Sequence, residues 1–265
     1  MNKPTELYII GGGRSITQGL SLGLPDKLEG KCCLTLNHSM FNYPTTCGVF
    51  CDYSHFYEKN FVKSKEPQPE LMVGKFHEEM TYQKNERLYS QIRLDLHCGK
   101  VILLNPSAHI YDRTLKQGCY SHLLSGLFAL SLAIYLLDVG KIFLIGFDAG
   151  CNPIDDKTKF KMYKGNKIAI ADNGKVLTHA YSTFHEGQGK VGIYYNKAND
   201  VVKMFEVFRP EQQVKIYNVS QSSRIETFEK ISYEQMFGLM NNERNEQRDY
   251  QNWIRESLST LGGKI

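Results

Sequence analysis

The sequence predicts an α/β fold with a mainly parallel, Rossmann-like sheet and helices on both faces. Short apolar runs that suit buried strands alternate along the chain with longer segments that suit helices, which is typical of parallel sheets with crossover helices. The first run, "ELYIIGG", is apolar from its second residue on, as expected of a strand covered on both faces. The 265 residues are enough for one such domain and a small extension.

Seven apolar runs are predicted to be strands, because each is short and ends in small or polar residues. Several of these ends carry a side chain that can form hydrogen bonds. In chain order, the predicted strands are residues 6–12, 31–37, 46–52, 70–74, 100–105, 141–148 and 213–218.

The segments between the runs are predicted to be helical. Residues 16–30 form a helix or turn broken at Pro25, residues 119–140 form a long helix with glycine at its end, and residues 197–210 form a helix that stops at a proline. Two further helical segments are expected, at residues 53–64 and 227–261.

Composition favours a cytoplasmic globular protein. Hydrophobic residues make up 42% of the chain, and the net charge of +4 permits a phosphorylated partner without requiring one. The apolar stretch 123–137 is short for a membrane span, and the N-terminus does not resemble a secretory signal. The seven cysteines lack metal-site spacing and are expected to be reduced thiols. A homo-oligomer is left open.

Ligands of open parallel sheets bind outside the carboxyl ends of the strands. A shared ligand cleft would explain why so many predicted strands end in groups that can form hydrogen bonds. These groups are Gly11, Gly12 and Gly13, Asn37, Asp52, Asn105, the stretch Gly146 to Asp148, and Asn218.

The stretch "GGGRSI" is neither a dinucleotide fingerprint nor a Walker loop, because Ile16 stands at the third motif position and no GK[ST] follows. A strand, a glycine turn and a helix start remain, with Ser15 or Thr17 able to cap the helix. Backbone N–H groups at a helix start favour phosphate. Phosphate binding and a purely structural turn both stay open.

An ordered set of motifs is similar to one enzyme superfamily. The set comprises "YIIGGGRSI", "LTLNHSMF", "GVFCDYSHFYEKN", "HLLSGLFALSLAIYLLDVGKIFLIGFDAG" and "KIYNVSQSSRIETFEKISYEQM". It resembles the bacterial lipo-oligosaccharide sialyltransferases, the motility accessory factor (flagellin) glycosyltransferases and the hydroxymethylpterin pyrophosphokinases. The resemblance covers about residues 6 to 235 and implies a nucleotide-sugar-dependent glycosyltransferase that needs no metal cofactor.

The resemblance also implies roles for particular residues. Gly11, Gly13 and Ser15 would lie against the nucleotide phosphates, while Asn37 and the pair Ser125 and Gly126 would contact the donor. "GFDAG", residues 146–150, matches a family stretch that carries a tyrosine absent here, and Tyr163 or Tyr181 would have to replace it.

The general base implied by the resemblance is a histidine, His185 or His179, which would take a proton from the acceptor hydroxyl. Arg14 or Lys190 could offset the leaving-group charge. The acceptor could be a glycan, a protein or a modified base. One alternative is a magnesium-dependent pyrophosphokinase that uses Asp52 and Asp148, and another is a non-catalytic nucleotide-binding protein.

The predicted organisation follows from these assignments. Residues 1–151 and 191–240 form the nucleotide-binding domain, and residues 241–265 form a C-terminal helical extension. Residues 152–190, rich in Lys, Asp, Gly and Tyr, are long for a passive connection and are expected to be a lid-like insertion or, alternatively, a solvated β-ribbon.

Overall fold

The structure is a computed structural model. It divides into two compact units. The first unit comprises Met1–Ile9, Leu28–Ile142 and Asn241–Ile265, and the second comprises Ile10–Lys27 and Phe143–Met240. The residues that the structure describes are 3–51, 69–75, 101–104, 124–149, 159–163, 166–170, 202–209 and 213–259.

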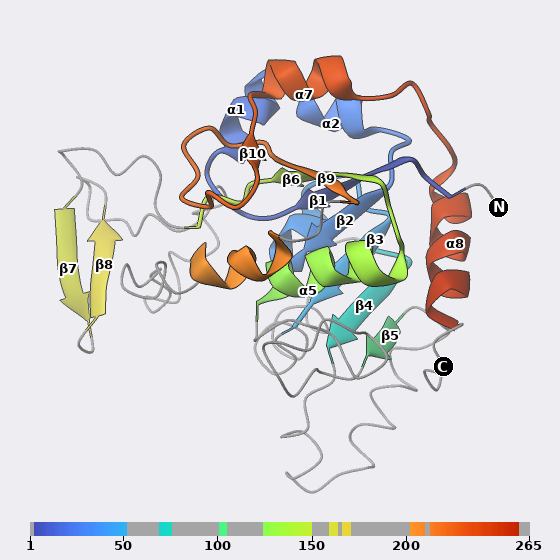
Figure 1. Cartoon of the computed structure of the whole chain (residues 1–265), viewed down its shortest axis with the longest axis horizontal. Coiled ribbons are helices and arrows are strands. Elements are labelled where there is room, and N and C mark those ends of the chain that lie inside the picture. Colours follow the sequence, from blue (N-terminus) through green and yellow to red (C-terminus); the bar gives the residue numbers. More distant parts are fainter. Residues whose placement is uncertain are drawn as a thin grey trace, which may run out of the picture. The chain divides into compact units, whose positions relative to one another are not determined.

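The first unit is built on parallel strands (Figure 1). Its strands lie in the order β1 (Glu6–Ile10), β2 (Cys33–Leu36), β3 (Cys47–Phe50), β4 (Met72–Lys75) and β5 (Val101–Leu104). The pairs from β2 to β5 are all parallel. Every residue of β1, β2 and β3 is buried, which explains the unbroken apolar runs. The predicted α/β fold with a parallel sheet is thereby confirmed.

Helix α5 (Ser125–Ser131) packs against β2 and β3 and continues as the π-helical segment η3 (Leu132–Leu136). Leu124 is extended, so the helix begins at Ser125 rather than at residue 119 as predicted. The predicted helix end at Gly140 is also wrong. The chain leaves the helix after Leu137, and Asp138 takes a left-handed conformation with φ 47°. Asp138 instead pairs with Lys3 at 2.7 Å.

The described part of the first unit has two other helices, of which the sequence predicted only one. The 3-10 helix η1 (Asn37–Phe41) directly follows β2 and was not predicted. Helix α8 (Gln247–Ser259) lies within the predicted helical segment 227–261 and buries Tyr250, Trp253 and Leu258. No helix in the described part of the chain is long and apolar enough to cross a membrane.

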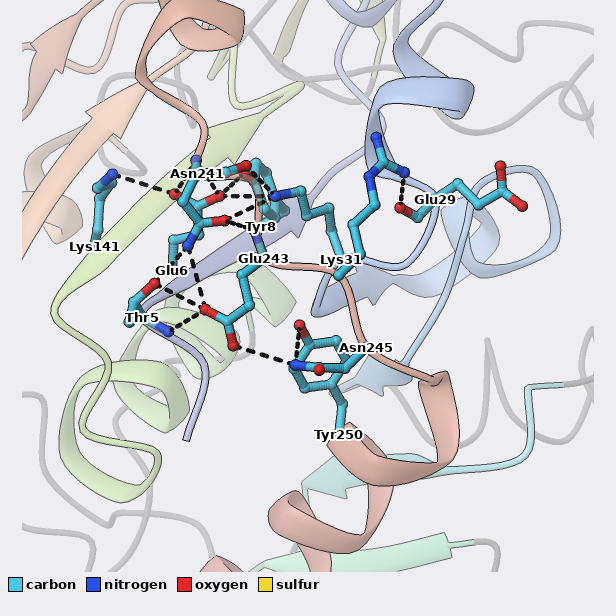
Figure 2. A network of polar contacts seen from close by, with 11 residues as sticks. Thr5, Glu6, Tyr8, Glu29, Lys31, Lys141, Asn241, Glu243, Asn245 and Tyr250 are labelled. Carbon is cyan, nitrogen blue, oxygen red and sulfur yellow. Dashed lines mark hydrogen bonds and ion pairs between the residues drawn. The ribbon is translucent and has the colours of Figure 1, made fainter. Parts of the chain in front are cut away.

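A buried ionic cluster centred on Glu6 ties the C-terminal segment to β1 (Figure 2). The Glu6 side chain is 3% exposed and accepts hydrogen bonds from Lys31 Nζ at 3.4 Å, from Lys141 Nζ at 3.2 Å and from the hydroxyl of Tyr8. The backbone N–H of Asn241 donates to the same carboxylate at 3.1 Å, and Lys31 Nζ donates to the Asn241 carbonyl at 2.6 Å. These contacts fix the chain before α8.

The second unit holds its strands in the order β10 (Glu229–Lys230), β9 (Lys215–Asn218) and β6 (Lys141–Ile145), and β10 pairs with β9 in parallel. Its helices are α1 (Ile16–Ser21), α2 (Leu24–Leu28) and α7 (Tyr233–Leu239), with the short η5 (Phe205–Phe208). A Cβ on Gly19 would lie 2.4 Å from the Tyr233 ring, so α1 and α7 pack closely through this glycine.

Two strands lie within the segment predicted as a lid-like insertion. β7 (Lys159–Tyr163) pairs with β8 (Asn166–Ile170) in an antiparallel hairpin. This hairpin matches the alternative interpretation of the segment, a β-ribbon, over these residues. The hairpin does not test whether the segment closes over a ligand, so the lid stays a prediction.

Candidate functional site

The predicted site residues fall into three groups. Four of them, Asp52, Asn105, His179 and His185, lie outside the described residues. Asn37, Ser125 and Gly126 belong to the first unit, and the glycine loop belongs to the second together with Gly146, Asp148 and Asn218. We define the glycine loop as Gly11 to Ser15.

The glycine loop is bound to the end of β6 through alternate residues. Gly11 N–H donates to the Ile145 carbonyl at 2.7 Å, and Gly13 N–H donates to the Gly146 carbonyl at 2.9 Å. Ser15 N–H donates to Asp148 Oδ2 at 2.8 Å. The ends of β1 and β6 therefore come together within the second unit, as the sequence predicts for strands that share a ligand edge.

Gly11 and Gly13 are required by close backbone approach. A Cβ on Gly11 would lie 2.8 Å from the Gly146 carbonyl oxygen. One on Gly13 would lie 2.5 Å from that oxygen and 2.6 Å from Asp148 Oδ2. Neither glycine has a positive φ, so space rather than backbone conformation excludes side chains. The structural turn left open by the sequence accounts for these two residues.

Gly12 and Arg14 differ from their neighbours. Neither backbone N–H has a hydrogen-bond partner within the described ranges, and the same holds for the Arg14 guanidinium. Both residues are partly exposed. Two N–H donors and a cationic side chain on one short loop are suited to an anion such as phosphate.

Asp148 is a buried acid in the second unit. Its residue is 3% exposed, and its two carboxylate oxygens accept from the N–H and the hydroxyl of Ser15. The flanking backbone is unusual, because Gly146 has φ 71° and Ala149 has φ 51°. A left-handed alanine is uncommon and concentrates at functional sites.

Asn218 supports the same strand end from β9. It is 0% exposed, and its Nδ2 donates to the Phe147 carbonyl at 3.2 Å and to Ser223 Oγ at 2.9 Å. Ser223 Oγ also donates to that carbonyl, at 2.6 Å. Asn218 therefore holds the chain just before Asp148 rather than facing an open edge. Sequence reasoning missed Ser223, since a serine in a turn carries no pattern that marks it.

In the first unit, Ser125 Oγ donates to Asn37 Oδ1 at 3.1 Å. Asn37 follows β2 and has φ 49°, a left-handed conformation that asparagine tolerates better than most residues. The bond to Ser125 orients the amide, and its Nδ2 group has no partner among the residues that the structure describes. Asn37 is partly exposed, so this N–H₂ group can donate to a ligand.

In the described parts of the chain, no three His, Cys, Asp or Glu side chains lie close enough together to bind a metal ion. The described thiols Cys32, Cys33, Cys47 and Cys51 are buried. Burial raises the pKa of the Cys33 and Cys47 thiols well above the usual range, which keeps them protonated and unreactive.

Comparisons with known proteins return nothing similar. No protein-family model matches this sequence, and no curated protein or solved structure matches it significantly.

Proposed function

We propose that the chain is a nucleotide-sugar-dependent, sialyltransferase-like glycosyltransferase that moves a sugar to an acceptor hydroxyl. The observation that carries this proposal is the hydrogen bond between Asn37 and Ser125. The resemblance assigns both residues to the donor site, although 88 positions separate them. Their direct contact in the folded chain places both side chains where one ligand could reach them and supports a shared binding role.

The glycine loop supports the nucleotide part of the proposal. Gly12 and Arg14 offer backbone N–H groups, and Arg14 adds a positive charge without a partner in the described ranges. Such donors stabilise the negative charge that develops on a departing nucleotide. In this proposal the phosphate contacts come from Gly12 and Arg14, while Gly11, Gly13 and Ser15 hold the loop.

Proton transfer is assigned to a histidine. A histidine with an ordinary pKa near 6.5 can accept the proton of an acceptor hydroxyl at neutral pH. His185 and His179 remain the proposed bases on the resemblance alone.

The pyrophosphokinase alternative depends on Asp52 and Asp148 as magnesium ligands, and Asp52 lies outside the described residues. Each carboxylate oxygen of Asp148 already accepts a hydrogen bond from Ser15, and the residue is 3% exposed. A metal ligand needs an oxygen directed at the ion and room for the ion's remaining water ligands. This geometry counts against Asp148 as a magnesium ligand.

A thermal-shift screen of the full chain with CMP-, UDP- and GDP-sugars, their free nucleotides and ATP tests the proposal. A ligand that binds the native state raises its melting temperature. The donor that does so is then incubated with the protein, and the products are separated by chromatography. Release of free sugar and nucleotide supports the proposal, and AMP formed from ATP supports the pyrophosphokinase. Stabilisation by none of these compounds would contradict nucleotide dependence.

A further inference from the structure

We infer that Asp148 is a positioning residue that sets the geometry of the nucleotide-binding loop through Ser15 and touches neither the nucleotide nor a metal. The inference rests on the proposed function. It assigns Asp148 a role that differs from donor binding and from magnesium binding, the two roles that the sequence suggests.

The first argument is the way the loop is fastened. Two of its ties run between backbone groups, from Gly11 to Ile145 in β6 and from Gly13 to Gly146 just after it. The third tie, at Ser15, depends on the Asp148 side chain. Thr17 Oγ1 also donates to the Arg14 carbonyl, at 2.7 Å, from within the same segment of chain. Asp148 is thus the side chain that joins the loop's end to the chain after β6.

The second argument is the direction of the Ser15 hydroxyl. Serine before a helix commonly accepts a hydrogen bond from a backbone N–H of the first turn. Ser15 precedes α1 but makes no such side-chain cap. Its hydroxyl donates to Asp148 Oδ1 instead, so both of its donors are directed at one buried carboxylate.

The third argument is the tight fit of the carboxylate. A Cβ added to Gly13 would lie 2.6 Å from Asp148 Oδ2. The backbone N–H of Arg224 donates to the Asp148 carbonyl at 3.1 Å. The left-handed Ala149 and Gly146 turn the backbone on either side of Asp148. The carboxylate is fixed in place, and Ser15 supplies the donors that a buried charge requires.

The consequence for the nucleotide is indirect. Because Gly11, Gly13 and Ser15 are fastened to β6, the N–H groups of Gly12 and Arg14 between them keep one orientation. Loss of the Ser15 tie frees the end of the loop that carries Arg14. Fixed donors bind an anion better than mobile ones, since less conformational freedom is lost on binding.

Titration calorimetry on the full chain tests this inference, with CMP, UDP, GDP and ATP as the probes. Asp148→Ala is expected to weaken the binding of the accepted nucleotide roughly 10- to 100-fold. Asp148→Asn, whose Oδ1 can still accept from Ser15 N–H, should stay within about threefold of the wild type. Ser15→Ala should weaken binding less than Asp148→Ala, and the double variant should bind like Asp148→Ala alone, because the two residues act as one unit. Asp138→Ala, which removes an exposed aspartate from the Lys3 pair, is the matched control and should bind normally.

Each contrary result has its own meaning. If the wild type binds a nucleotide and Asp148→Ala binds it equally well, the inference is wrong and the proposed function stands. Equal loss in Asp148→Asn and Asp148→Ala, or binding that requires Mg²⁺ only when Asp148 is present, would overturn the positioning role. A wild type that binds none of the four probes overturns the proposed function and this inference with it. Should Asp148→Ala fail to fold, Asp148→Asn still decides, because binding within about threefold of the wild type supports the role and a roughly 10- to 100-fold loss overturns it.

Discussion

Ser125 Oγ donates a hydrogen bond to Asn37 Oδ1 at 3.1 Å and so joins the start of α5 to the end of β2. The contact leaves the Asn37 N–H₂ group directed elsewhere, at a residue held in the left-handed region with φ 49°. Asn37 therefore combines a polar side chain with a left-handed backbone conformation. Substitutions can test the contribution of each separately.

Asn37→Gly should keep the backbone conformation and lose only the amide, whereas Asn37→Ala should lose both. We expect the alanine variant to be less stable than the glycine variant by about 1 kcal/mol, the usual cost of a left-handed non-glycine residue. Both should bind the donor roughly 3- to 10-fold more weakly than wild type, the worth of one hydrogen bond. Urea denaturation and titration calorimetry measure the two effects. Unchanged donor binding in Asn37→Gly would remove Asn37 from the site.

Gly13→Ala should destabilise the protein by about 1–3 kcal/mol, because a new methyl group forces a shift in tightly packed surroundings. The added Cβ would lie 2.5 Å from the Gly146 carbonyl oxygen. Gly238→Ala in α7 is the matched control, since nothing lies within 4 Å of its added Cβ. That variant should be more stable by about 0.5–1 kcal/mol. Denaturation midpoints that do not separate the two variants would refute the close approach of the glycine loop to β6.

The sequence predicts strands well here because burial on both faces leaves a strong local signal. Each of the seven predicted strands overlaps an observed one, from β1 to β6 and at β9. Helix ends are predicted less well. The left-handed residue at the end of η3 is Asp138 rather than Gly140, and its pairing with Lys3 depends on a partner 135 positions away.

The glycine loop shows why site roles are harder to predict. Three adjacent glycines indicate that something approaches the backbone, and the sequence cannot show whether a ligand or the chain itself does so. For Gly11 and Gly13 the approaching group is the end of β6. Ser15 bonds to Asp148, which lies 133 positions further along the chain. Only the folded structure shows this contact. The Asn37–Ser125 contact was not predicted either, although the resemblance assigns each of the two residues to the donor site.

Lys31→Met should destabilise the fold strongly, because it removes one partner from the buried cluster around Glu6. The Lys31 and Glu6 side chains are each 3% exposed. Breaking such a pair costs about 3–5 kcal/mol. The exposed pair of Lys215 and Glu229, with side chains 59% and 54% exposed, supplies the control. Lys215→Met should leave the denaturation midpoint almost unchanged. If Lys31→Met lowers the midpoint no more than Lys215→Met does, the cluster has no structural role.

Stability should fall as the pH rises above about 10. Burial raises the pKa of Tyr250 to about 12, whereas an exposed tyrosine titrates near 10. The folded state therefore favours the protonated phenol, and this contribution is complete below pH of about 10 and is lost toward pH of about 12. Tyr250→Phe should lose less stability than the wild type between pH of about 8 and about 11 in urea unfolding. Parallel losses in the two proteins would show that Tyr250 titrates normally.

The central claim is that the glycine loop binds the nucleotide phosphate through the N–H groups of Gly12 and Arg14. Amide NMR of the ¹⁵N-labelled chain during titration with the nucleotide selected by the thermal-shift screen tests it most directly. The account predicts saturable shifts at Gly12 and Arg14 that exceed those at Gly13 and Ser15, whose N–H groups are already bonded to Gly146 and Asp148. Binding at saturation with no shift at Gly12 or Arg14 would contradict it.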